Sequence, residues 1–81
     1  MNLDELRTIM RQCGVEDGVD LDGDILDLEW QELGYDSLAV LEITTAVQHA
    51  ARTPLLEEEV ALLTTPRLLL ERLGTLTPAA V

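Results

Sequence analysis

Apolar residues recur at intervals of three and four along most of the chain, which is the spacing of helices with one buried face. The first stripe consists of Leu3, Leu6, Ile9, Met10 and Cys13. Asn2 precedes it with Glu5 three residues later, the spacing of a capping box, and Gly14 is a natural stop. The pattern therefore predicts a first helix from Leu3 to Cys13.

A second helix is predicted from Ser37 to Ala51. Asp36 is a strong N-cap residue at its start, and Gly34 allows the tight turn that leads into it. Its core-facing stripe is expected to consist of Val40, Ile43, Val47 and Ala50, with Ala39 and Ala46 alongside. A different side carries Leu38, Leu41 and Thr45. These three residues either flank a wide core face or form a surface for partner proteins.

Two shorter helices are predicted after Pro54, because proline disfavours helical geometry in the residue before it. Residues 55–63 have an acidic first turn, which suits the positive end of a helix dipole. Thr65 and Pro66 are a cap and a first helical residue, and the helix that they open ends before Gly74. Its stripe is expected to be Leu68, Leu69 and Leu73, with Leu70 at the edge.

Residues 15–36 form a long connection between the first two helices. Its apolar anchors are Ile25, Leu26, Leu28, Trp30 and Leu33, and one short helical turn is expected near Glu29–Leu33. Its acids partly match the calcium loop of an EF-hand, at Asp20, Asp22, Gly23, Ile25 and Glu29. The first ligand position falls on Gly18, which has no side chain, so the match argues only weakly for calcium.

These elements predict an all-α domain, a small four-helix bundle with three main helices, one short third helix and a long first loop. Residues 1–81 are expected to be one domain with its core at about 3–74 and a frayed tail at 75–81. The hydrophobic fraction is 47%, but the aromatics are one Trp and one Tyr, so the core must be aliphatic.

Sixteen acidic residues against five arginines give a net charge of −11. This charge argues against binding nucleic acid or an anionic membrane and favours partners with basic patches. The single cysteine, Cys13, cannot form an internal disulfide and is expected to be a small buried hydrophobe. Since no signal peptide or membrane span is visible, a cytoplasmic location is expected. The protein is also expected to be a monomer.

Catalysis by this chain is not expected. A serine nucleophile needs a base within hydrogen-bond reach, but His49 lies about 18 Å from Ser37 along the same helix at ~1.5 Å per residue. One Cys and one His cannot make a zinc site, and no glycine-rich phosphate loop is present. Ser37 instead lies where a helix N-terminus favours negative charge, a suitable place for a phosphate ester. By position alone, an ordinary polar residue of a first turn is the commoner explanation.

The stretch from Leu33 to Ile43, with Gly-Tyr-Asp-Ser-Leu at its centre, resembles the attachment region of acyl carrier proteins. It is most similar to the discrete carriers of bacterial aromatic (type II) polyketide synthases. The similarity covers about residues 3–74 and includes the acidic positions of the third helix and the pair Thr64-Thr65. It implies that Ser37 receives a 4'-phosphopantetheine arm from coenzyme A. The arm's thiol then holds a growing polyketide, or a fatty acyl chain, as a thioester.

The resemblance also implies the surroundings of the arm. Asp36 and Leu38 flank the attachment site. The partner-docking residues are Leu38, Leu41, Glu42, Thr45, Leu55, Glu57 and Glu58. The implied partners are a phosphopantetheinyl transferase, an acyl transferase, a ketosynthase and tailoring enzymes, all docking through basic patches. In polyketide carriers an arginine near Arg11 is able to approach the acyl chain.

Two departures from the family concern the end of the second helix. The family often has an aromatic residue and a glycine there, whereas this chain has Ala51 and Arg52, which are not an easy left-handed cap. The family's proline usually follows the next apolar residue, but Pro54 precedes Leu55. The alternatives to a polyketide carrier are an unmodified acidic helical interaction module and, within the carriers, a fatty-acid or peptidyl carrier.

Overall fold

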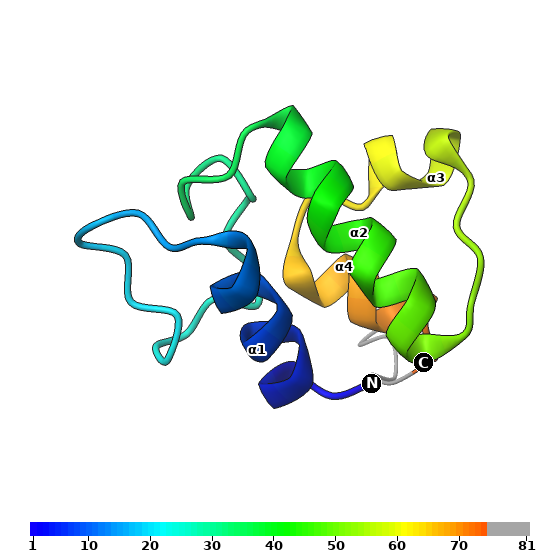
Figure 1. Ribbon diagram of the computed structural model, residues 1–81, viewed down its shortest axis with the longest axis horizontal. Helices are drawn as coiled ribbons and strands as arrows, with labels where there is room; N and C mark the ends of the chain where they lie inside the picture. The colour runs from blue at the N-terminus through cyan, green and yellow to red at the C-terminus, as the bar shows by residue number, and fades with distance from the viewer. Residues whose placement is uncertain (75–81) are drawn as a thin grey trace.

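A computed structural model describes residues 1–74, which form four helices. These are α1 (Leu3–Cys13), α2 (Ser37–Ala51), α3 (Glu57–Leu62) and α4 (Pro66–Arg72). Helix α2 runs through the middle of the molecule, with α1 packed beside it, α4 behind it and α3 at its outer side (Figure 1). The all-α prediction is confirmed, and no helix in this part of the chain is long and apolar enough to cross a membrane. The tail predicted at 75–81 lies outside the described residues.

Three of the predicted helix starts have the expected side-chain caps. Asn2 Oδ1 accepts the Glu5 N–H at 2.8 Å, and Asp36 Oδ1 accepts the Ala39 N–H at 2.8 Å. Thr65 Oγ1 accepts the Leu68 N–H at 3.2 Å. Each bond satisfies one of the backbone donors that a helix N-terminus leaves without an intrahelical partner.

The core is mostly aliphatic, with Trp30 and Tyr35 as its two aromatic members, and two of its stripes differ from the expectation. On α4, Leu70 is fully buried and Leu68 is 37% exposed, so the stripe runs through Leu69 and Leu70. On α2, Ala50 is exposed and Thr44 is 2% exposed. The Thr44 hydroxyl donates within its own helix, toward the carbonyls of residues 40 and 41 at 2.9 and 3.1 Å. A polar residue can therefore occupy the core without an unsatisfied group.

The two aromatic residues join the long loop to the helices. Trp30 is 6% exposed, and its indole Nε1–H donates to the Leu63 carbonyl at 2.7 Å. Tyr35 is 5% exposed, and its hydroxyl donates to the Met10 carbonyl at 3.1 Å. Each ring supplies apolar area to the core while its polar atom binds a backbone carbonyl, one after α3 and one on α1.

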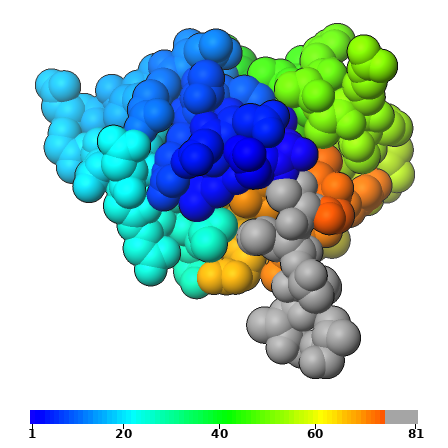
Figure 2. Space-filling model, turned by 90° about the horizontal axis from the view of Figure 1, so that it is seen from below, coloured from blue at the N-terminus to red at the C-terminus, as the bar shows by residue number. Residues whose placement is uncertain are grey.

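The long loop packs against the helices through Leu21, Ile25 and Leu33, each at most 3% exposed. Leu21 was not predicted as an anchor. The expected helical turn is present, since the Leu33 N–H donates to the Glu29 carbonyl at 3.2 Å. In the space-filling view the first half of the loop and α1 form one continuous surface (Figure 2).

Arginines hold this loop in place. The Arg7 side chain is 17% exposed and donates to the Leu21 carbonyl at 2.6 Å and the Gly23 carbonyl at 2.9 Å. Arg11 pairs with Asp22. Arg7 is therefore not a solvated surface charge, because its guanidinium satisfies backbone acceptors that the irregular loop cannot pair within itself.

The turn after α2 also differs from the expectation. Arg52 itself adopts the left-handed conformation, with φ 52° and ψ 38°, and its N–H donates to the Gln48 carbonyl. The Gln48 side-chain Oε1 accepts the Leu55 N–H at 3.1 Å. Gln48 therefore supports both sides of the corner, and an arginine takes the place for which glycine is best suited.

Candidate functional site

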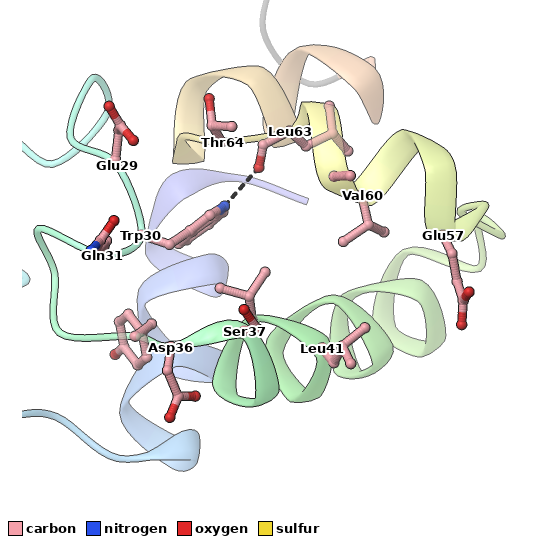
Figure 3. A pocket seen from close by; sticks show the side chains of 13 residues that line it. Glu29, Trp30, Gln31, Asp36, Ser37, Leu41, Glu57, Val60, Leu63 and Thr64 are labelled. Carbon is pink, nitrogen blue, oxygen red and sulfur yellow. Dashed lines mark hydrogen bonds between the residues drawn. The ribbon is translucent and has the colours of Figure 1, made fainter.

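Ser37 is the only serine in the chain and the first residue of α2, and its side chain is exposed. The turn before it depends on Gly34, whose φ is +86°. A Cβ at Gly34 would meet only the flexible side chain of Glu16, which can move aside, so the positive φ is what favours glycine at this position. Asp36 caps the helix and its side chain points away from the neighbouring groove (Figure 3). The Ser37 hydroxyl thus lies at the mouth of a helix, open to solvent.

A groove with a volume of about 710 Å³ begins beside Ser37. It lies between α2, α3 and the loop segment 29–35, with Trp30 at one end (Figure 3). Its apolar lining includes Trp30, Val40, Leu41, Val60, Ala61 and Leu63. The size is that of a site for a small organic ligand. The groove was not predicted, since Trp30 had been assigned only as a core anchor and α2 and α3 are separate in sequence.

The polar lining of the groove is uncharged or acidic. Glu29 and Glu57 contribute carboxylates, and Gln31 and Thr64 contribute neutral groups. No arginine belongs to this lining. The indole N–H of Trp30 is already bonded to Leu63 and presents no free donor (Figure 3). The groove therefore favours neutral, largely apolar groups and repels anions.

The α3 wall of the groove contains no fully buried residue. It is held by Glu59, which accepts the Leu56 N–H at 2.9 Å and the Arg72 Nε–H at 2.6 Å. The Arg72 hydrogen bond, followed by the bond from Leu56, holds the pKa of Glu59 below its ordinary value. A polar link to α4 thus supports a helix that has little apolar burial of its own.

Most of the predicted docking residues lie on the surface. Leu38 is 66% exposed and Leu41 is 46% exposed, large fractions for leucines beside a helix N-terminus. The side chains of Glu42, Thr45, Glu57 and Glu58 are also exposed.

Leu55 is the exception and requires a correction. It is 8% exposed and belongs to the core cluster, so its side chain offers a partner almost no surface. The cause is the corner after α2, where the hydrogen bond from its N–H to Gln48 Oε1 holds Leu55 at the edge of the core.

The remaining candidate side chains do not assemble with Ser37. Arg11 binds Asp22 on the long loop and is not part of the groove lining, so an approach to an acyl chain gains no support. Cys13 is half-buried; burial raises the pKa of its thiol, and the charge of Glu42 raises it further. His49 is exposed in the last turn of α2.

Two of the acids that match the calcium loop, Asp20 and Asp22, are engaged within the loop and with α1. Asp20 Oδ1 accepts the Asp22 N–H at 2.9 Å, and Asp22 pairs with Arg11. Among residues 1–74, no three His, Cys, Asp or Glu side chains come together where they could hold a metal ion.

The chain is similar to carriers of polyketide synthases from Streptomyces. It is 46% identical over 72 residues to the granaticin polyketide synthase acyl carrier protein of Streptomyces violaceoruber, covering 88% of this chain and 85% of that one. It is 43% identical over 82 residues to the tetracenomycin polyketide synthase acyl carrier protein of Streptomyces glaucescens, covering 100% and 95%. No protein-family model matches the chain.

Solved structures agree with these relatives. The octanoyl form of the acyl carrier protein from the actinorhodin polyketide synthase of Streptomyces coelicolor superposes with a TM-score of 0.82 at 34% identity, covering 89% of this chain and 85% of that one. Its 5-phenyl-3-oxo-pentyl form gives a TM-score of 0.80 at 33% identity, covering 91% and 87%. The similarity thus extends over nearly the whole chain in both sequence and fold.

Proposed function

The chain belongs to the acyl carrier proteins of type II polyketide synthases, and from this premise we propose that Ser37 is the residue that holds its arm. The protein carries acyl chains on a 4'-phosphopantetheine group and is a carrier rather than a catalyst. The observation that supports Ser37 is its position: it is the only serine, it is exposed, and it is the first residue of a capped helix. There the partial positive charge of the helix end favours the phosphodiester.

The groove beside Ser37 is proposed to shelter the acyl chain. An arm attached at Ser37 starts at the border of this groove, which is lined by Val40, Leu41 and Val60 on the facing sides of α2 and α3. The carrier of the actinorhodin synthase has been solved with hexanoyl and octanoyl chains attached. In this chain, neutral acyl chains gain most from the groove, because the carboxylates of Glu29 and Glu57 lie in its lining.

The partner enzymes, among them the ketosynthase and the acyl transferase, are proposed to dock around Ser37. Leu38 and Leu41 offer exposed apolar area, while Glu42, Glu57 and Glu58 offer negative charge to basic patches. The net charge of −11 steers the association with basic partners electrostatically. Binding through this small surface is weak enough for the partner enzyme to release the carrier. The cytosolic location expected from the sequence stays a prediction.

The test of the attachment site is the mass of the intact protein after incubation with coenzyme A and a phosphopantetheinyl transferase. The wild type is expected to gain the mass of one arm, and Ser37→Ala none. Thr45→Ala is the matched control, because it removes another exposed hydroxyl from the same helix. A protein that stays unmodified, or a Ser37→Ala variant that still gains the arm, would refute the assignment. The first result would favour the unmodified interaction module.

A further inference from the structure

Helix α3 is the wall of the groove with the least support of its own. None of its residues is buried, Leu62 is 75% exposed, and Val60 is its one member that packs partly against the core. With six residues it is also too short to be stable as an isolated helix. Its place opposite α2, and with it the groove, therefore depends on the bonds that α3 makes with other parts of the fold.

The C-terminal end of α3 is held to the long loop by Trp30. The indole Nε1–H donates to the Leu63 carbonyl at 2.7 Å, and the backbone N–H of Trp30 donates to the Thr64 carbonyl at 3.2 Å (Figure 3). Both acceptors follow the last residue of the helix. The two bonds therefore do not reach the N-terminal end of α3, where Glu57 borders the groove.

One carboxylate connects the rest of α3 to the other helices. Glu59 Oε2 accepts the Leu56 N–H at 2.9 Å and closes the first turn, while Oε1 accepts the Arg72 Nε–H at 2.6 Å. Within residues 1–74 the second bond is the one side-chain hydrogen bond between α3 and another helix. Arg72 is the last residue of α4, a helix whose Leu69 and Leu70 are fully buried, so its backbone is firmly placed.

We infer that Arg72 is a positioning residue for the acyl chain: through Glu59 it holds α3 opposite α2, so that the groove exists before the chain enters. Neither side chain lines the groove, so both act on the chain only through the place of α3. A preformed groove spares the entering chain the cost of ordering its wall, which strengthens the binding of the chain. The inference rests on the proposed function, because it takes the groove as the shelter of a chain attached at Ser37.

The test measures how fast hydroxylamine cleaves octanoyl and acetyl thioesters on the holo carrier. An octanoyl chain buries apolar area in the groove and draws its thioester out of the solvent, whereas an acetyl group has little apolar area to bury. Each rate is divided by the rate for the same thioester on free pantetheine, which removes differences in intrinsic reactivity. In the wild type the octanoyl thioester is expected to be protected and the acetyl thioester to be exposed.

Arg72→Gln removes the cation and is expected to lower the octanoyl protection about two- to fivefold, as for loss of an exposed ion pair. The acetyl rate is expected to stay unchanged. Arg72→Lys retains the charge and a donor and is expected to keep most of the protection. Glu59→Gln weakens the same bond from α3, so the double variant with Arg72→Gln is expected to lose no more than either single variant.

Arg11→Gln is the matched control, because it makes the same side-chain change and also removes an exposed ion pair. Its partner is Asp22, and neither residue lines the groove. A small fall in Tm is expected for Arg11→Gln as for Arg72→Gln, but with the octanoyl protection of the wild type. A loss of stability alone therefore does not imitate the expected result.

Hydrogen exchange tests the same link in the unloaded protein. The Val60 N–H donates to the Leu56 carbonyl at 3.0 Å and reports the opening of α3. Arg72→Gln is expected to speed the exchange of this amide about two- to fivefold, and Arg11→Gln is expected to leave it unchanged.

Wild-type octanoyl protection in Arg72→Gln, an equal loss in Arg11→Gln, or an unchanged exchange of the Val60 amide would overturn the inference. An octanoyl thioester that is as exposed as the acetyl thioester in the wild type would refute the shelter proposed for the groove, and the inference with it. The two failures are distinct, because the second is already visible without any substitution.

Discussion

Replacement of Trp30 tests how the groove and the core depend on one side chain. Trp30 is 6% exposed, lines the groove, and donates its indole N–H to the Leu63 carbonyl at 2.7 Å. Trp30→Phe keeps an aromatic ring and removes the donor, whereas Trp30→Ala removes both. The pair of variants therefore separates the contribution of the hydrogen bond from that of the packing.

The magnitudes follow from the surroundings of the ring. Loss of a buried hydrogen bond costs about 1–3 kcal/mol when the remaining partner is stranded. Here the Leu63 carbonyl borders the groove, so water can replace the indole, and the cost should fall near the lower end. With the smaller ring included, we expect Trp30→Phe to cost about 1–2 kcal/mol. Trp30→Ala leaves a cavity as well and should cost about 3–5 kcal/mol.

These losses are large for a chain of 81 residues. At about 0.05–0.15 kcal/mol per residue, the whole free energy of unfolding is roughly 4–12 kcal/mol. Urea unfolding followed by far-ultraviolet circular dichroism measures both variants, because the helices report unfolding without the tryptophan. Equal costs for Phe and Ala would refute the role assigned to the packing of the ring, and a cost below about 0.5 kcal/mol for Phe would refute the role assigned to the hydrogen bond. A cost below about 2 kcal/mol for Ala would show that packing of the ring contributes little to the free energy of unfolding.

Two further changes test the helix ends that border the groove. Asp36→Ala removes the hydrogen bond that caps the Ala39 N–H and should lower the free energy of unfolding in urea by about 0.5–2 kcal/mol. Asp36→Asn retains an acceptor and should cost much less. Equal costs for the two variants would mean that the capping bond is unimportant. Glu59→Gln should lower the Tm at pH 7, because the bond from Arg72 stabilises the ionised form and lowers the pKa of Glu59. The stabilisation is complete above the ordinary value of 4.5 and is lost as the pH falls through the lowered pKa, so the difference in Tm should vanish there. A difference that persists at lower pH would show that the carboxylate charge is not the cause.

Local sequence signals determined the helices of this protein and the position of the candidate serine. The caps at Asn2, Asp36 and Thr65 act on backbone groups three residues away, and the apolar stripes follow the period of a single helix. Such interactions are complete within one element. The resemblance around Ser37 is also local, which is why the family was identified before any packing was known.

Features that depend on contacts between distant segments could be found only in the structure. The groove exists because α3 lies opposite α2 and the loop near Trp30, although Val60 on α3 is 20 residues from Val40 and 30 residues from Trp30 in the chain. The burial of Leu70, Thr44 and Leu55 likewise depends on the faces of neighbouring elements. A period of 3.6 residues marks a face of a helix but not which edge of that face a partner covers.

The arginines show most clearly what the sequence reveals and what it does not. The sequence shows that they are outnumbered by acidic residues, so the chain is acidic. Their roles came from the fold: Arg7 satisfies loop carbonyls 14 and 16 residues away, and Arg52 turns the chain in a conformation usual for glycine. Composition and local pattern thus determined the helical elements and the acidity of this carrier. Tertiary structure decided which residues line the groove and what the arginines contact, because the residues next to a side chain in the sequence do not reveal its partners across the fold.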